Sequence, residues 1–196
     1  MAKMSRKVTM ALAVSAALLT ARAATAADTP ERATIVLHVD DFANLLGTDL
    51  NAAEAVAGRI FAAAGIRTVW VHGRDKGPRI GGALHVKVLV LSREMAEQKI
   101  SADGVGPAVL GQAAKVCGRA YIFSHRIDAL AARNQHSVSD LLGRVLAHEV
   151  GHLLLPENSH SGTGIMAAAI DLNPSAVLRF TPEQTAAIRQ TIASGN

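Results

Sequence analysis

The chain has 196 residues, with 20 Lys and Arg, 16 Asp and Glu, and one cysteine. That length predicts one domain. Four of the basic residues and none of the acidic ones fall within residues 1–27, so the rest of the chain carries 16 charges of each sign. This balance argues against a nucleic-acid partner, which would call for a clustered basic face, and against a polybasic membrane contact.

Residues 1–27 have the pattern of a secretory signal peptide. Basic residues precede an apolar run from Val8 to Leu19, and the small residues Ala24 and Ala26 stand where a signal peptidase reads the chain. We expect cleavage near Ala26 or Ala27. Because the apolar run is too short to span a bilayer stably, we expect no membrane anchor and an exported protein, either periplasmic or secreted.

Residues 28–196 are expected to form one α/β domain that remains a monomer. The one cysteine, Cys117, cannot form an internal disulfide. We predict that Cys117 is a buried, small apolar residue. The domain must then be held together by an ordinary hydrophobic core, which a chain of this length can build.

Hydrophobic spacing predicts the elements in chain order. Gly104–Gln112 contains apolar residues among glycines and a proline, which suits an edge strand. Ser92–Lys99 fits either a short helix or a loop, and Ala129–Gln135 fits either a short helix or a turn. The other expected strands are Thr34–Val39, Arg67–His72, Leu84–Leu91 and Arg119–Phe123, and the expected helices are Thr48–Ala64, Ser137–Leu153 and one that opens at Thr181.

The helix expected over Ser137–Leu153 contains the pentapeptide His148 to His152, which reads H-E-x-x-H. Two residues four positions apart lie about 40° apart around a helix axis, so both imidazoles can face one point. That arrangement suits a Zn2+ ion, which binds neutral imidazole nitrogens. Glu149 follows the first histidine and could take a proton from a zinc-bound water as general base. Pro156 is expected to end the helix.

A catalytic zinc site needs three protein ligands and one open position. His160, which follows His152 by eight residues and lies beyond Pro156, is the best candidate for the third ligand. Glu157 and Asp171 are alternatives, because carboxylate oxygens also bind zinc.

The H-E-x-x-H pentapeptide, His160 and the tripeptide ending in Met166 together resemble the metzincin clan of zinc endopeptidases. The resemblance implies that His148, His152 and His160 bind zinc and that Met166 lies in a tight turn beneath them. It implies hydrolysis of a peptide or protein substrate by a zinc-activated water. It also implies a zincin-like α+β fold: a small mixed, twisted sheet with an antiparallel edge strand that binds substrate, two main helices and a C-terminal helix.

The chain departs from the usual metzincin pattern, H-E-x-x-H-x-x-G-x-x-H, in three ways. Leu155 stands at the glycine position, Asn158 stands at the third histidine, and no tyrosine follows Met166. Two other functions therefore stay open. One is a zinc-binding module without catalysis, and the other is a zinc amidase that acts on cell-wall peptide.

Overall fold

The computed structural model describes residues 33–45, 47–73, 75–173, 175–176 and 178–195, so the expected signal peptide lies outside the described residues. No helix among the described residues is both long enough and apolar enough to cross a membrane. The strands are β1 (Thr34–Asp41), β2 (Arg67–His72), β3 (Ala83–Val90), β4 (Gly111–Ala114) and β5 (Arg119–Ile122). The helices are α1 (Gly47–Ala63), α2 (Arg93–Asp103), α3 (Ser124–Asn134), α4 (Val138–Leu154) and α5 (Pro182–Ser194), and a short 3₁₀ helix, η1 (Lys115–Cys117), joins β4 to β5.

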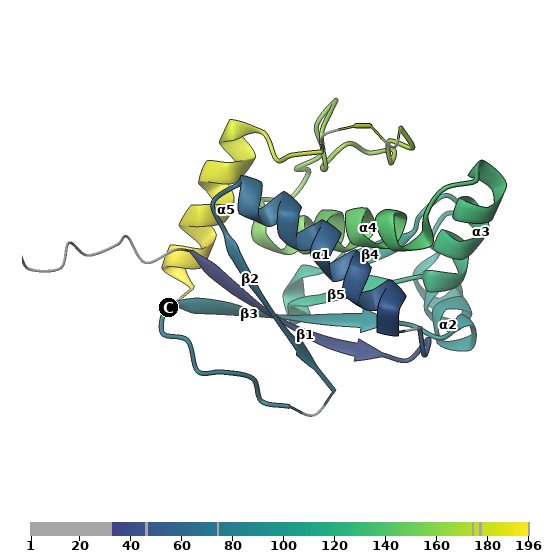
Figure 1. The fold of residues 1–196 in the computed structure, drawn as a ribbon, viewed down its shortest axis with the longest axis horizontal. Helices are drawn as coiled ribbons and strands as arrows, with labels where there is room; N and C mark the ends of the chain where they lie inside the picture. The colour runs from purple at the N-terminus through teal and green to yellow at the C-terminus, as the bar shows by residue number, and fades with distance from the viewer. Residues whose placement is uncertain (1–32, 46, 74, 174, 177, 196) are drawn as a thin grey trace, which may run out of the picture. The chain divides into compact units, whose positions relative to one another are not determined.

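The five strands form one mixed sheet in the order β2-β1-β3-β5-β4 (Figure 1). β1 runs parallel to both β2 and β3, and β3 runs parallel to β5. β4 pairs antiparallel with β5 at one edge, from Gly111 opposite Ile122 to Ala114 opposite Arg119. The expected mixed sheet with an antiparallel edge strand is therefore confirmed.

One face of the sheet carries the main core. Ile35, Leu37 and Val39 alternate along β1 and are almost fully buried, as strand periodicity requires for a covered face. α1 and α4 pack together over this face (Figure 1). Gly143 of α4 allows their close approach, because a Cβ atom there would lie 2.5 Å from the carbonyl oxygen of Ala53 in α1. The two main helices expected from the sequence are thus the pair that backs the sheet.

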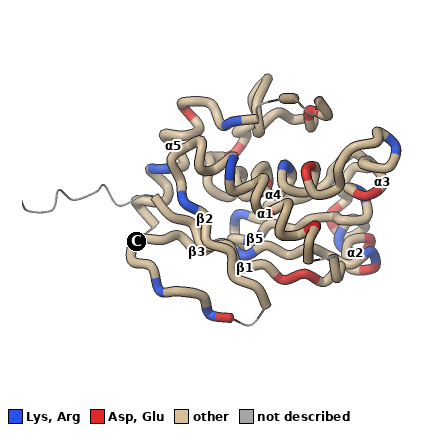
Figure 2. The backbone as a smooth tube through the Cα atoms, viewed as in Figure 1, with Lys and Arg blue, Asp and Glu red and all other residues tan. Residues whose placement is uncertain are grey.

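The opposite face of the sheet is covered in part by α2. Leu89 and Tyr121 alternate with the core residues of β3 and β5 and pack with buried Ala96 of α2. Acidic and basic residues both occur along this helix, coloured red and blue in Figure 2, and Lys99 Nζ lies 2.8 Å from Asp103 Oδ2. α2 therefore packs its apolar residues against the sheet, while its charged residues face outwards and form ion pairs with one another.

The edge strand differs from its predicted position. The sequence predicts an edge strand over Gly104–Gln112, but α2 continues to Asp103 and Gly104 ends it in a left-handed conformation, with φ 65°. The strand begins only at Gly111, where pairing with β5 starts. Of the two segments with open alternatives, Ser92–Lys99 falls mostly within α2 and Ala129–Gln135 falls mostly within α3.

Cys117 is exposed, so its predicted burial is wrong. It ends η1, the tight turn that connects β4 to β5, and its Sγ lies 3.4 Å from the carbonyl oxygen of Ala114. A turn at the edge of a sheet leads the chain into solvent, whatever the apolar character of its side chains.

Candidate metal centre

α4 has a defined beginning and end that aim its last turn at the following loop. Ser137 caps the helix, because its Oγ accepts a hydrogen bond from the backbone N–H of Asp140 at 3.2 Å. Leu155 is extended, with φ −100° and ψ 159°, the conformation that a residue before proline prefers. The expected end of the helix before Pro156 is confirmed, and the chain turns there toward His160.

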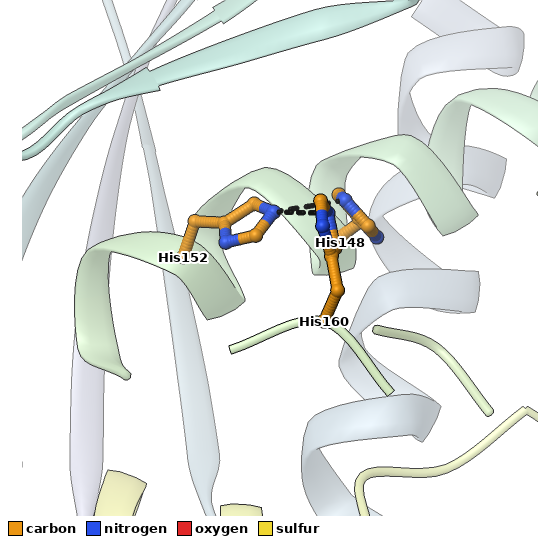
Figure 3. Close-up of side chains that lie close together, drawn as sticks. All are labelled: His148, His152 and His160. Carbon is orange, nitrogen blue, oxygen red and sulfur yellow. Dashed lines mark hydrogen bonds between the residues drawn. The ribbon is translucent and has the colours of Figure 1, made fainter. Parts of the chain in front are cut away.

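Three histidine side chains converge at this end of α4 (Figure 3). Nε2 of His152 lies 3.0 Å from Nε2 of His148 and 3.0 Å from Nε2 of His160. Among the described residues, these three form the group of side chains that could hold a metal ion, with one ligand atom from each. The alternatives Glu157 and Asp171 line the same cleft but stand outside this group. The structure therefore places His160, and neither of these carboxylates, beside the two histidines of α4.

The outer nitrogens of the helix pair have hydrogen-bond partners. Nδ1 of His148 lies 2.8 Å from the carbonyl oxygen of Ile165, and a carbonyl only accepts, so Nδ1 carries the proton and Nε2 presents a lone pair. Ser159 Oγ lies 3.3 Å from Nδ1 of His152. When His152 donates its Nδ1 proton to this hydroxyl, the lone pair on its Nε2 faces the lone pair on Nε2 of His148, 3.0 Å away. A cation bound by both nitrogens would offset the repulsion between these lone pairs. Such outer partners are typical of metal-binding histidines.

The surroundings keep two of the rings neutral. Burial lowers the pKa of His148. Burial, followed by the charges of His148, His160 and Lys115, lowers the pKa of His152 to about 4. Metal ions bind the neutral imidazole, so neither ring needs to lose a proton at pH 7 before it can act as a ligand.

Glu149 lies next to the histidines and is buried, with 7% of its surface exposed. Burial raises the pKa of its carboxyl to about 8, and a hydrogen bond from the backbone of Ala113 in β4 opposes the rise. A divalent cation nearby would lower this pKa, since an opposite charge favours the carboxylate. The site thus combines a cation-binding cluster with a carboxyl group whose proton affinity lies near neutrality.

These shifts predict how the stability of the metal-free protein depends on pH. The pKa of Glu149 rises from 4.5 to about 8 on folding, so its stabilising effect is complete below pH 4.5 and is lost as the pH rises through 8. The pKa of His152 falls from 6.5 to about 4, so stability rises with pH in that range. Of these two effects, only that of Glu149 remains above pH 6.5. Urea unfolding should show a loss between pH 6.5 and 8, with a slope of at most about 1.4 kcal/mol per pH unit.

Glu149→Gln should remove this loss, because the amide does not titrate. A metal-free variant that destabilises as steeply as the wild type above pH 6.5 would contradict the assignment to Glu149. Glu157→Gln is the matched control, since Glu157 is exposed and lies at the rim of the same cleft.

Met166 lies beneath the last turns of α4. It is fully buried, and a Cβ atom on Gly151 would come within 2.6 Å of its Sδ. The turn that carries it depends on Gly164, whose φ is 80° and whose missing Cβ would lie 2.5 Å from the carbonyl oxygen of Arg179. The backbone N–H of Ser161 donates to the carbonyl of Met166 at 2.9 Å. This turn therefore also supports the loop of His160.

The three histidines line a cleft with a volume of about 1070 Å³. Its lining residues come from β4, α3, α4 and the segment after Met166. Val109 and Val116, just before and after β4, are exposed apolar side chains on its rim. Its apolar lining includes Leu110, Leu130, Val145, Ile165, Ile170 and Leu172.

Three polar residues around the centre were missed by the sequence reasoning. Ser159 contacts His152, Gln184 of α5 contacts Ser159, and the charge of Lys115 acts on His152. Lys115 Nζ also donates to the carbonyl oxygen of Leu155 at the end of α4. Ser159 could have been suspected from its place beside His160, but Gln184 and Lys115 lie far away in the sequence and no local pattern marks them.

No protein-family model matches the sequence, and no curated protein matches it either. The class of protein is therefore defined by the chain's own residues. It is a mixed α/β protein in which an α-helix and the loop after it bring together three histidines that could hold a metal ion.

Proposed function

We propose that this chain is an exported zinc-dependent peptidase of metzincin-like design. The observation that carries the proposal is the convergence of three Nε2 atoms beside the buried carboxyl of Glu149, in a cleft below an edge strand. Three neutral imidazoles form a common ligand set of catalytic zinc. Export follows from the pattern of residues 1–27.

Glu149 acts as the general base. Zinc, when bound, supplies a Lewis acid that polarises the scissile carbonyl and lowers the pKa of water toward 7. Glu149 accepts a proton from the attacking water and passes it to the departing amine. The raised pKa belongs to the metal-free site, and a bound cation favours the carboxylate, which can then take up the proton. Burial strengthens the hold of the carboxylate on that proton until it passes to the amine.

The substrate would bind as an added strand along β4. This strand is the last in the sheet order, so its outer edge is open to a further strand in the described sheet. An extended peptide there gains main-chain hydrogen bonds, and its side chains point alternately into the cleft and away from it. The hydrogen bond from Ala113 to Glu149 ties this edge directly to the base.

The test is cleavage of a broad panel of peptides by the purified mature protein, with and without a zinc chelator. Peptide cleavage that requires zinc and Glu149 supports the proposal. Stoichiometric zinc without hydrolysis would indicate the binding module instead. Release of amines from purified wall fragments, without cleavage of peptides, would indicate the amidase.

Gly111→Ala should reduce hydrolysis by about 100-fold while zinc binding stays unchanged. A Cβ atom at this position of β4 would lie 2.7 Å from Cγ of Glu149 and 2.9 Å from the carbonyl oxygen of Tyr121. The carboxyl must therefore move, and a displacement of about 1 Å in an active site costs about that factor. The measurements are kcat/KM on a cleaved peptide and zinc content.

Gly106→Ala is the matched control for this variant. Gly106 lies a few residues before β4, and a Cβ atom there would meet nothing within 4 Å. We expect its activity to equal that of the wild type. Full activity in Gly111→Ala would show that the position of Glu149 beneath β4 is unimportant for the reaction.

A further inference from the structure

The loop that carries His160 needs support from outside itself. It leaves α4 at Pro156, and Asn158 within it has φ 57°, a left-handed conformation that is uncommon for residues other than glycine. A loop with such a residue keeps its shape only when surrounding contacts hold it. The carbonyl of Met166 accepts a hydrogen bond from Ser161, the residue after His160. Ser159, the residue before His160, is held by α5.

α5 begins with a reciprocal cap that uses Gln184. The backbone N–H of Gln184 donates to Thr181 Oγ1 at 3.2 Å, and Gln184 Oε1 accepts from the backbone N–H of Thr181 at 2.9 Å. This capping box satisfies two donors at the start of the helix. It also fixes the orientation of the side-chain amide, because Oε1 already accepts the hydrogen bond from Thr181 and Nε2 must point the other way.

The other end of the same amide reaches the histidine loop. Gln184 Nε2 donates to the backbone carbonyl of Ser159 at 3.0 Å. Ser159 in turn places its Oγ 3.3 Å from Nδ1 of His152, and the next residue is His160. A short chain of hydrogen bonds thus runs from the start of α5 to two of the three rings in Figure 3.

We propose that Gln184 is a positioning residue for the metal centre: its amide nitrogen holds the Ser159 carbonyl, and so sets the placement of His160 and the orientation of the His152 ring. The inference rests on the proposed zinc site. It assigns to α5 a second role besides packing, because the cap that starts the helix also fixes the loop of the third ligand.

The substitution Gln184→Glu separates the two roles. Glutamate keeps an oxygen for the Thr181 N–H and is itself a common capping-box residue, so the helix start is preserved. It loses the Nε2 donor and turns a carboxylate oxygen toward the carbonyl of Ser159. We expect zinc affinity, measured by competition with a chromophoric chelator, to fall about 10- to 100-fold, the usual effect of losing an outer partner. The visible spectrum of the Co2+ form should change as well.

Gln190→Glu is the matched control, with the same change of charge on an exposed position of the same helix. Its zinc affinity and Co2+ spectrum should equal those of the wild type. Thermal unfolding of the metal-free proteins shows whether each variant is folded. If Gln184→Glu does not fold, Gln184→Ala carries the test, because it removes the Nε2 donor while the backbone N–H of residue 184 can still donate to Thr181 Oγ1. We expect an affinity loss of about 10-fold for it.

The outcomes separate this inference from the proposed function. A wild-type protein that binds no zinc overturns both. Tight binding by the wild type, with equal affinity and spectrum in Gln184→Glu, or in Gln184→Ala where that variant carries the test, overturns the positioning role alone. Equal losses in Gln184→Glu and Gln190→Glu would assign the effect to charge and would also overturn it.

Discussion

Replacing Glu149 by glutamine will lower kcat/KM for peptide hydrolysis by at least about 1000-fold and leave zinc stoichiometry unchanged. The amide has nearly the shape of the carboxyl but cannot accept the proton of the attacking water, and general-base catalysis contributes up to about 10⁴-fold. Because Glu149 lies outside the three-histidine cluster, the ligand set stays whole. Fluorogenic peptide assays with metal analysis of the same preparation measure both quantities.

The control for this variant is Glu97→Gln, the same substitution at an exposed glutamate of α2 that does not line the cleft. It should retain wild-type activity. Hydrolysis by Glu149→Gln at the wild-type rate would rule out Glu149 as the base. Loss of zinc together with activity would mean that the carboxyl serves the metal and not the water.

Replacing His160 by alanine should weaken zinc binding by more than about 100-fold and abolish hydrolysis with it. Loss of an outer partner of a ligand typically costs 10- to 100-fold, and loss of the ligand itself removes a bond to the metal. His148 and His152 would remain as a pair on α4, with the third position open to water. Dialysis against a chelator, followed by metal analysis, gives the direct comparison with the wild type.

His85→Ala is the control, because His85 is exposed on a strand and belongs to a different pair, with His38 Nε2 2.8 Å from its Nδ1. It should bind zinc as the wild type does. If His160→Ala binds zinc stoichiometrically and as tightly as the wild type, another group must supply the third ligand. Glu157 and Asp171, which line the same cleft, would then be tested by the same measurement in combined variants.

Local spacing was enough to find the helix of the centre and two of its histidines. Helical periodicity, the cap at Ser137 and the proline at position 156 act within a few residues, so they appear in the sequence as directly as in the structure. The same holds for the parallel strands, whose apolar runs agree with their observed bounds to within about two residues. The order of these strands in the sheet, in contrast, comes from pairing between distant segments.

The sequence by itself determined the H-E-x-x-H helix, its two inward-facing rings and the neighbouring carboxyl, because all three follow from 3.6 residues per turn. Only the tertiary structure decided which later residue joins them and where the edge strand lies. His160 reaches the pair because Gln184 and the Met166 turn hold its loop. β4 begins at Gly111 because pairing with β5 begins there. The contact between Gln184 and Ser159 joins residues 25 positions apart in the chain, and no local pattern encodes it.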